Sequence, residues 1–388
     1  MTQSPTRRDF LRHSLAAGVA LPVLGAAWPA AAPGAAPLPG PAVDPAPEKL
    51  RILFLGGTGF LGPATVEVAL ARGHAVTLFN RGKTRPELFP AANKLRGDRN
   101  QGELDALKGH DFDAVVDLSG YVPGHVAATA GLLADHARQY IFISSVSVYA
   151  AFGESSAPVS EQSPLATVAP DVVAGVKTMR ESIPHYGAMK ALCEKAAEEA
   201  MPGRVANIRP GLIVGPRDPS DRFTWWPVRV DRGGEVLAPG DPDGLVQFVD
   251  VRDLGAWLVR CVEENTTGVY NAVGLNGPLS MAEFLHGCKC ATVTPCRFTW
   301  VSEEFLEAQK IRAWTQLPMW LPAKVRGPIA NAAAIAQGLV FRPAADTIRD
   351  TLAWAKTERG TKPFRQTGLP AEREKAALEA WAAKNPGR

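Results

Sequence analysis

The chain has 388 residues, a net charge of +3, and 46% hydrophobic against 21% charged residues. This length allows one large domain or two modest ones, and the balance is that of an ordinary globular protein. A net charge this small gives no indication of a nucleic-acid-binding surface. Five cysteines in a long chain exclude a small protein framed by disulfides, so packing must stabilise the core.

The N-terminal segment has the features of an export signal. Arg7 and Arg8 stand side by side before a mildly apolar stretch, 15–28, that glycine and proline interrupt. A membrane-spanning helix needs roughly 20 predominantly apolar residues, so this stretch is too short. We expect a removable twin-arginine signal peptide over 1–32, followed by a Pro/Ala-rich linker over 33–48. The twin-arginine export machinery would then deliver the protein to the periplasm or the medium; a basic tail and an uncleaved anchor are the alternatives.

The folded part opens with an apolar run over 50–55 that leads directly into a glycine-rich loop. The pattern then predicts a helix over 63–72 and a second strand over 75–79. This order of strand, turn, helix and strand is the context that the dinucleotide-binding fingerprint requires. We therefore expect the loop to bind the pyrophosphate of NAD or NADP through Gly56, Gly57, Thr58, Gly59, Phe60, Leu61 and Gly62.

The glycines of this loop have separate predicted tasks. The early ones permit a tight turn, Gly59 lets the backbone approach the pyrophosphate, and Gly62 lets the helix pack close to the strand. The helix N-terminus offers free N–H groups and a positive dipole end to the phosphates.

The end of the second predicted strand bears on the choice of cofactor. NAD enzymes place a carboxylate there, about 20 residues after the loop, to bind the ribose. This chain has Asn80, Arg81 and Lys83 instead, which favours NADP. NAD stays open, because the two cations could form a solvated loop while Asn80 alone contacts the ribose. Asp98 could contact the adenine or could be a turn aspartate.

Hydroxyl groups follow another predicted strand, over 139–145, at the edge where open α/β sheets bind ligands. Further along, Tyr186 and Lys190 are four residues apart and therefore share one face of a helix that Ser182 is expected to cap. A nearby ammonium lowers the pKa of a tyrosine. Tyr186 could then exchange a proton with a substrate alcohol while a hydride moves to or from the nicotinamide.

Together, the glycine loop, the serine strand and the Tyr-x-x-x-Lys pair resemble the extended short-chain dehydrogenase/reductase family, in its NAD-dependent epimerase/dehydratase group. The resemblance covers about residues 50 to 355 and includes the segments 209–216, 247–253 and 268–272. It implies that Ser145, rather than Ser144 or Ser147, is the catalytic serine, acting with Tyr186 and Lys190, and that Lys190 also binds the cofactor.

The resemblance also implies an α/β fold with two interleaved parts. A Rossmann domain with a doubly wound parallel sheet, with a predicted strand at 113–118, is expected over 49–210. A small C-terminal α/β substrate lobe is expected over 211–360, and a surface helix or tail over 361–388.

Three departures from the family pattern bear on function. The stretch 157–182 is insertion-like and would shape or cover the pocket. Val146 and Ser147 stand where the family's dehydratases carry an acidic pair, which disfavours dehydration. The loop from Asn80 to Lys83 resembles a branch that includes chloroplast stem-loop-binding proteins, some of which bind RNA.

Candidate substrate residues lie in the predicted lobe. Arg222 could bind an anionic group, and Trp225 and Trp226 could stack on a sugar ring or a base. It is equally consistent that these residues pack the lobe. The spacing of His286, Cys288, Cys290 and Cys296 fits no standard zinc pattern, so we expect thiols and no metal.

We therefore expect an enzyme that oxidises a hydroxyl of a small-molecule substrate, a sugar or sugar derivative, through a transient ketone. An exported enzyme would best keep its NAD or NADP tightly bound and regenerate it in each turnover, as an epimerase or a glycoside-eliminating enzyme does. The alternatives are an NADPH-dependent reductase of a small carbonyl compound and a non-catalytic NAD(P)- or RNA-binding module. The export signal and the charge argue against a nucleic-acid partner, and a homodimer is left open.

Overall fold

The computed structural model describes residues 44–153, 155–364 and 367–386. The predicted signal peptide, 1–32, and the linker up to residue 43 lie outside these residues. Over the described ranges, the structure contains no helix with both the length and the apolar character needed to cross a membrane.

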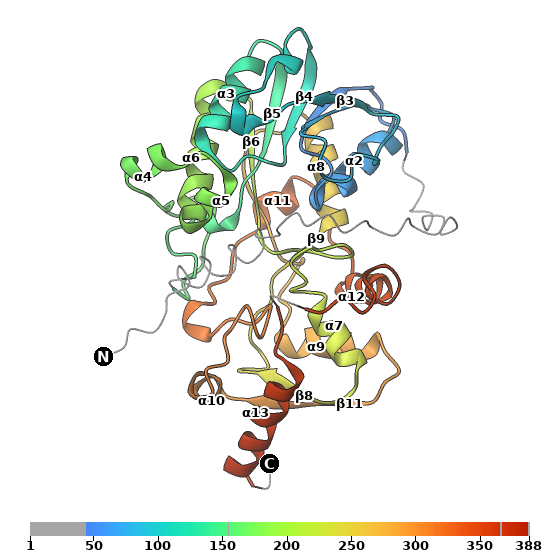
Figure 1. Ribbon diagram of the computed structural model, residues 1–388, viewed down its shortest axis with the longest axis vertical. Coiled ribbons are helices and arrows are strands. Elements are labelled where there is room, and N and C mark those ends of the chain that lie inside the picture. Colours follow the sequence, from blue (N-terminus) through green and yellow to red (C-terminus); the bar gives the residue numbers. More distant parts are fainter. Residues whose placement is uncertain (1–43, 154, 365–366, 387–388) are drawn as a thin grey trace.

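A seven-stranded parallel sheet with helices on both faces forms the upper domain in Figure 1, in the order β10-β6-β5-β4-β1-β2-β3. Its strands are β1 (Arg51–Leu55), β2 (Ala75–Asn80), β3 (Asn93–Arg96), β4 (Phe112–Asp117), β5 (Ala137–Ile143), β6 (Val205–Pro210) and β10 (Gly268–Ala272). The predicted Rossmann sheet is thus confirmed. The four strands expected from the sequence correspond to β1, β2, β4 and β5 within two residues at each end.

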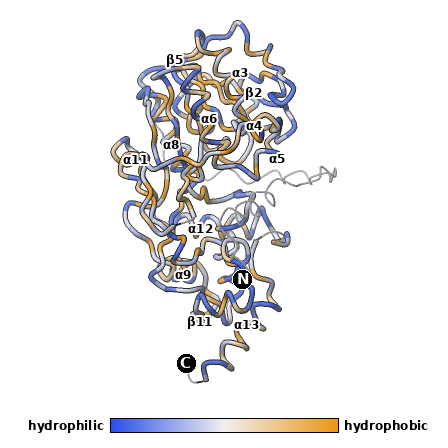
Figure 2. Tube along the Cα trace, turned by 90° about the vertical axis from the view of Figure 1, so that its left-hand side faces the viewer, coloured by the Kyte–Doolittle hydropathy of each residue, from blue (hydrophilic) through white to orange (hydrophobic). Residues whose placement is uncertain are grey.

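The continuous apolar run of β1 reflects burial on both faces of the sheet. Ile52 and Phe54 face α2 (Leu61–Ala71) and α8 (Val251–Glu263), whereas Leu53 and Leu55 face α3 (Pro123–Leu133) and α6 (Tyr186–Ala200). Successive side chains of a strand point to opposite faces, so a strand between two helical layers must be apolar throughout. Figure 2 shows these hydrophobic segments inside the domain and hydrophilic segments toward its outside.

A smaller lobe forms the lower half of the molecule (Figure 1). Its strands are two parallel pairs, β7 (Ile213–Val214) with β9 (Val249–Asp250) and β8 (Gly234–Pro239) with β11 (Cys296–Val301). Its helices are α7 (Trp225–Asp231), α9 (Met281–Cys290), α10 (Glu303–Ala308), α12 (Ala344–Trp354) and α13 (Ala371–Lys384). The chain crosses back between the two lobes, since α8 and β10 belong to the sheet domain. Three short helices complete the fold: α4 (Pro170–Gly175), α5 (Met179–Ser182) and α11 (Ala332–Ala336).

The C-terminal helix α13 is anchored to the lobe and is more than a surface tail. Glu374 is 3% exposed and accepts hydrogen bonds from Arg229 Nε at 2.6 Å and from the Leu237 backbone N–H at 3.1 Å. Trp381 packs edge-on against Phe305. The far end of the helix projects from the lobe in both views (Figures 1 and 2).

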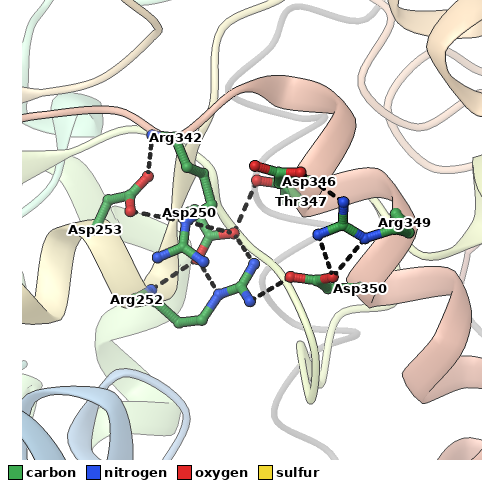
Figure 3. Close-up of polar contacts among 8 residues, drawn as sticks. All are labelled: Asp250, Arg252, Asp253, Arg342, Asp346, Thr347, Arg349 and Asp350. Carbon is green, nitrogen blue, oxygen red and sulfur yellow. Dashed lines mark hydrogen bonds and ion pairs between the residues drawn. The ribbon is translucent and has the colours of Figure 1, made fainter. Parts of the chain in front are cut away.

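A network of charges fastens α12 of the lobe to the start of α8 (Figure 3). Asp250 is buried, caps α8 through the backbone N–H of Arg252 at 2.8 Å, and accepts the Thr347 hydroxyl hydrogen bond at 2.8 Å. Arg252 bridges Asp250 at 2.7 Å and Asp350 at 2.6 Å. Buried carboxylates are stable only when paired and hydrogen-bonded, so this cluster fixes the lobe relative to the sheet.

Candidate active site

The glycine loop joins β1 to α2 and has the backbone that the fingerprint predicts. Gly56 and Gly57 have φ values of +110° and +88°, which only glycine adopts readily. A Cβ on Gly62 would lie 2.4 Å from the backbone carbon of Gly57, so α2 begins in direct contact with the loop. A Cβ on Gly59 would meet no atom within 4 Å. The loop therefore leaves open space at Gly59, close to the N-terminus of α2. This helix begins at Leu61, two residues earlier than expected, because Phe60 and Leu61 already turn into it.

The end of β2 carries a polar cluster with more cations than expected. Asn80 donates to the Gly56 carbonyl at 3.1 Å and accepts from Arg96 at 3.1 Å, so its side chain links the loop to β3. Arg81 is half-exposed and lies 4.0 Å from Asp98. Lys83 is exposed. Asp98 accepts the Asn100 backbone N–H at 3.0 Å, as a turn aspartate does.

Arg85 is a residue that sequence reasoning missed. Its guanidinium donates to the Thr58 carbonyl at 2.7 Å and also to the Gly59 carbonyl. Its own backbone has φ +41°, an uncommon value for a non-glycine residue. Only the adjoining Arg81 and Lys83 hinted at this part of the chain, because nothing in the sequence shows that the 81–92 loop folds back onto the glycines.

A buried carboxylate, also missed, stands at the end of β4. Asp117 is fully buried, accepts two hydrogen bonds from Arg99 at 2.9 and 3.0 Å, and accepts the Tyr140 hydroxyl at 2.8 Å. Burial raises the pKa of Asp117, but the Arg99 guanidinium outweighs it, so the pKa lies below its usual range. This ion pair underlies the sheet edge next to the glycine loop, because Ser119 N–H donates to the same carboxylate at 3.0 Å.

Ser145 and Tyr186 come together through a close approach of two backbone segments. β5 ends at Ile143, and Ser145 caps the short turn Val146–Val148 by accepting the Ser147 N–H at 3.1 Å. Tyr186 is the first residue of α6. A Cβ on the next residue, Gly187, would lie 2.0 Å from the Ser147 carbonyl oxygen. Glycine at this position thus lets the start of α6 reach the serine turn.

Lys190 is buried one turn further along α6. Its ammonium donates to the Gly120 carbonyl at 2.7 Å and to the Ile143 carbonyl, and it lies 4.2 Å from the Phe142 ring centre. Burial lowers the pKa of Lys190 to about 8. Burial raises the pKa of Tyr186, although the Ser145 hydroxyl and the Arg222 guanidinium act in the opposite direction. The expected lowering of the tyrosine pKa by Lys190 is therefore absent, because desolvation dominates and two carbonyls hold the ammonium.

A second buried network holds α6 in place and was also missed. Glu194, one turn beyond Lys190, pairs with Arg209 of β6 at 2.6 and 2.9 Å. Arg209 donates in turn to the Tyr149 hydroxyl at 2.9 Å, four residues after Ser145. The network therefore ties the helix of Tyr186 to the turn of Ser145.

A cavity of about 170 Å³ lies between the sheet edge and the lobe. Ser145, Tyr186, Gln247, Arg222 and Trp314 are among the residues that line it. Arg222 lies over the Trp314 ring, 5.1 Å from its centre. Among the predicted residues, the structure thus brings Ser145, Tyr186 and Arg222 to one cavity.

Trp225 and Trp226 do not line this cavity, which corrects their expected stacking role. They are 2% and 0% exposed, pack edge-on against each other in the lobe core, and Trp226 donates to the Pro318 carbonyl. The W-W pair alone could not reveal this, since either tryptophan of an α-helix of unknown orientation can face a ligand or the core.

The stretch 157–182 reaches the cavity wall indirectly. Val159 pairs with Ile329, which lines the cavity.

Ser182 does not cap α6, contrary to expectation. Its hydroxyl donates back to the Met179 carbonyl at 2.7 Å, and Thr178 caps the preceding helix α5 in a capping box.

The cysteines near the end of α9 form no metal centre with their neighbours. Cys288 and Cys296 are buried and Cys290 is exposed. Within the described ranges, no group of three or more His, Cys, Asp or Glu residues could hold a metal ion.

Comparison with known proteins places these features in a family. The model of the "NAD dependent epimerase/dehydratase family" matches residues 52–273. A curated relative, the chloroplast stem-loop binding protein of 41 kDa b from Arabidopsis thaliana, is 24% identical over 254 residues, which are 59% of this chain and 60% of the relative. The chain thus spans 60% of that relative's length.

Solved structures share the fold. The UDP-glucuronic acid 4-epimerase from Bacillus cereus in complex with NAD has a TM-score of 0.57 and 16% identity, covering 81% of this chain and 99% of its own. The human epimerase family protein SDR39U1 (isoform 2) with NADPH has a TM-score of 0.51 and 20% identity, covering 78% and 99%. At these identities the likeness establishes the fold only, with neighbours that hold either cofactor.

Proposed function

The chain belongs to the NAD dependent epimerase/dehydratase family, and we propose that it is an NAD(P)-dependent oxidoreductase or epimerase acting on a hydroxyl of a sugar or sugar derivative through a transient ketone. The observation that carries this proposal is the shared cavity: Ser145, Tyr186 and Arg222 line it, and Ser145 follows the carboxyl end of β5. Substrates of open α/β sheets bind at this edge.

The cofactor supplies hydride transfer when bound, and the chain's own groups would handle the proton. The Ser145 hydroxyl would hold the substrate oxygen. Tyr186 is protonated near neutral pH, because burial raises its pKa, and is therefore suited to give a proton to a ketone oxygen. In the other direction, the Arg222 guanidinium favours the phenolate. Lys190, with a pKa of about 8, would hold a ribose hydroxyl of the cofactor.

The side chains at the end of β2 bear on which cofactor is bound. We propose NADP or NAD, with Arg81, Lys83 and Arg96 favouring a 2′-phosphate, since three cations and no free carboxylate stand there and Asp98 is already engaged by Arg81. We also propose that the protein is exported by the twin-arginine route and keeps its cofactor bound, as a periplasmic enzyme without a cofactor pool would need to do.

Tyr186→Phe tests the proposed chemistry, with Tyr270→Phe as the matched control. Tyr270 donates its hydroxyl to the Thr267 carbonyl and does not line the cavity. We expect Tyr186→Phe to retain the cofactor, measured by native mass spectrometry of the mature protein, and to lose turnover by roughly 100-fold or more. Equal activity of Tyr186→Phe and the control would refute the enzyme proposal.

A binding module is the second candidate, and the name of the Arabidopsis relative favours it. It predicts that the purified protein shifts an RNA stem-loop in a gel and that Tyr186→Phe leaves the shift unchanged.

A protein purified without cofactor that binds only added NADPH would favour the third candidate, a reductase of a small carbonyl compound.

A further inference from the structure

Arg222 is half-buried, and its ion pairing differs from that of four other arginines in the interior of the protein. Those four hold carboxylates at close range: Arg99 with Asp117, Arg209 with Glu194, Arg229 with Glu374, and Arg359 with Asp221, at 2.6 to 2.9 Å. Across the described ranges, no carboxylate forms an ion pair with the Arg222 guanidinium within 4 Å. The carboxylate that influences Arg222 is that of Asp218, which acts without a contact ion pair. The guanidinium N–H groups are therefore available to an anionic ligand.

The loop that carries Arg222 is held rigidly. Two of its residues, Arg217 and Asp221, have φ values of +73° and +56°, which are strained for side chains of this kind. Asp221 is clamped by Arg359 through two hydrogen bonds of 2.9 Å, and the Ser220 carbonyl accepts the Thr367 hydroxyl at 3.0 Å. Strain that the surroundings enforce is typical of a positioned functional group.

The guanidinium faces the reacting groups. Arg222 interacts electrostatically with Tyr186, lies over the Trp314 ring at 5.1 Å and lines the same cavity as Ser145. A second cation on the cavity wall, Arg326, lies 3.8 Å from Asp241, so its charge is already balanced. Of these two arginines on the cavity wall, Arg222 is the one without a carboxylate within 4 Å among the described residues, and Asp218 influences it from further away.

The cavity is also small. Its 170 Å³ is below the roughly 300–1,000 Å³ of pockets that enclose drug-sized ligands, and much of its wall is apolar, including Leu212, Leu245 and Val273. This volume is enough for a ligand of monosaccharide size.

We propose that the substrate of this site is a small hydroxylated acid of monosaccharide size, whose oxyanion binds Arg222 while a neighbouring hydroxyl lies against Ser145 and Tyr186. The oxyanion is a carboxylate or a phosphate, since a guanidinium binds both in the same way. The role of the hydroxyl rests on the proposed function; the recognition of the oxyanion does not.

Asp218 supplies a second prediction of this proposal. Asp218 and Tyr186 are the titratable groups that interact with Arg222, and Asp221 also influences Asp218. Burial raises the pKa of Asp218 to about 6. Above that pH its carboxylate offsets the charge of Arg222, and below it the offset is lost. The oxyanion should therefore bind more tightly at about pH 5 than at about pH 8.

The test is calorimetric titration of the mature protein with matched acids and neutral sugars. The panel compares three acids, glucuronate, galacturonate and gluconate, with two neutral sugars, glucose and galactose. Glucose 6-phosphate shows whether the site prefers a phosphate to a carboxylate. UDP-glucuronate shows whether a larger ligand binds. The protein variants are Arg222→Gln, Arg222→Lys and, as a control, Arg297→Gln, whose side chain is 74% exposed in the same lobe.

We expect at least one acid to bind 10-fold or more tightly than its neutral counterpart, more so at low pH. Arg222→Gln should abolish that preference, Arg222→Lys should keep part of it, and Arg297→Gln should not change it. Equal binding of acids and neutral sugars, equal losses of both in Arg222→Gln, tighter binding of UDP-glucuronate than of any small acid, or binding of none of them would overturn the proposal.

Turnover separates this inference from the proposed function. Tyr186→Phe should still bind the acid. If the acid binds through Arg222 but no panel member is epimerised or reduces the bound cofactor, the proposed function fails and the oxyanion site stands. If neutral sugars react and acids do not, the enzyme stands and the oxyanion site fails.

Discussion

Replacing each of two glycines of one loop by alanine should have different effects, one on stability and the other on cofactor binding. Gly62 touches backbone: an added Cβ would lie 2.4 to 2.7 Å from three atoms of Gly57. Gly59 touches nothing within 4 Å, and its φ does not fall in the left-handed region. We therefore expect Gly62→Ala to damage the fold and Gly59→Ala to damage cofactor binding alone.

The magnitudes follow from these contacts. A backbone atom cannot rotate away as a side chain can, so the methyl group of Gly62→Ala must separate α2 from the loop. Overpacking of this kind costs about 1–3 kcal/mol or more of unfolding free energy. Gly59→Ala removes conformational freedom from the unfolded chain and should be neutral or stabilising by up to about 1 kcal/mol. Its methyl group occupies the space that the pyrophosphate needs, and a loss of 10- to 100-fold in affinity corresponds to about 1.4–2.8 kcal/mol.

The assay is urea unfolding followed by tryptophan fluorescence, combined with titration of NADPH and NADH into each variant. The control variant is Gly131→Ala, because an added Cβ there also meets nothing within 4 Å. Gly203→Ala is unsuitable as a control, because the φ of +69° at this position would strain an alanine. If Gly59→Ala binds both cofactors like the wild type, the pyrophosphate does not approach this glycine and the assignment of the loop is wrong.

Three further predictions concern buried groups. Asp218→Asn should stabilise the protein by up to roughly 3 kcal/mol at about pH 8 and by progressively less below pH 6. The reason is that burial raises the pKa of this carboxyl from 3.8 to about 6, so that its ionised form destabilises the folded state. Urea unfolding at both pH values measures the effect, and a pH-independent effect would contradict it. Glu194→Gln should destabilise by about 3–5 kcal/mol in the same assay, since it leaves Arg209 buried without its carboxylate, whereas the exposed Glu199→Gln should change little. Trp226→Phe should lower the unfolding midpoint, with a cost of about 1–3 kcal/mol, and leave substrate affinity unchanged; a raised KM with unaltered stability would restore the stacking role that the structure argues against.

The sequence predicted the local structure well wherever one segment carries both the pattern and its geometry. The glycine loop, its flanking strand and helix, and the Tyr186–Lys190 pair are local arrangements, and a strand buried on two faces has to be apolar throughout. The group of hydroxyls after β5 followed from its place at the end of a strand, because parallel strands present their carboxyl ends at one edge, whereas the choice of Ser145 among them rested on the family resemblance.

Contacts between residues far apart in the chain could not be predicted from the sequence. Arg85 returns to the glycine loop across 27 residues, and Arg209 meets Glu194 from a neighbouring strand. The two tryptophans face the core because the lobe closes around them, an orientation that no local period specifies. The pKa of Tyr186 was likewise mispredicted, since desolvation depends on everything packed around a group.

The sequence by itself thus determined the order of elements, the backbone of the glycine loop and the one-turn spacing of Tyr186 and Lys190, because each depends on neighbours within one turn or one strand. Only the tertiary structure decided which arginine at the cavity has no carboxylate within 4 Å among the described residues. Charge balance is a property of all the groups around a site, and for Arg222 it is settled by a loop that Arg359, more than a hundred residues away, holds in place.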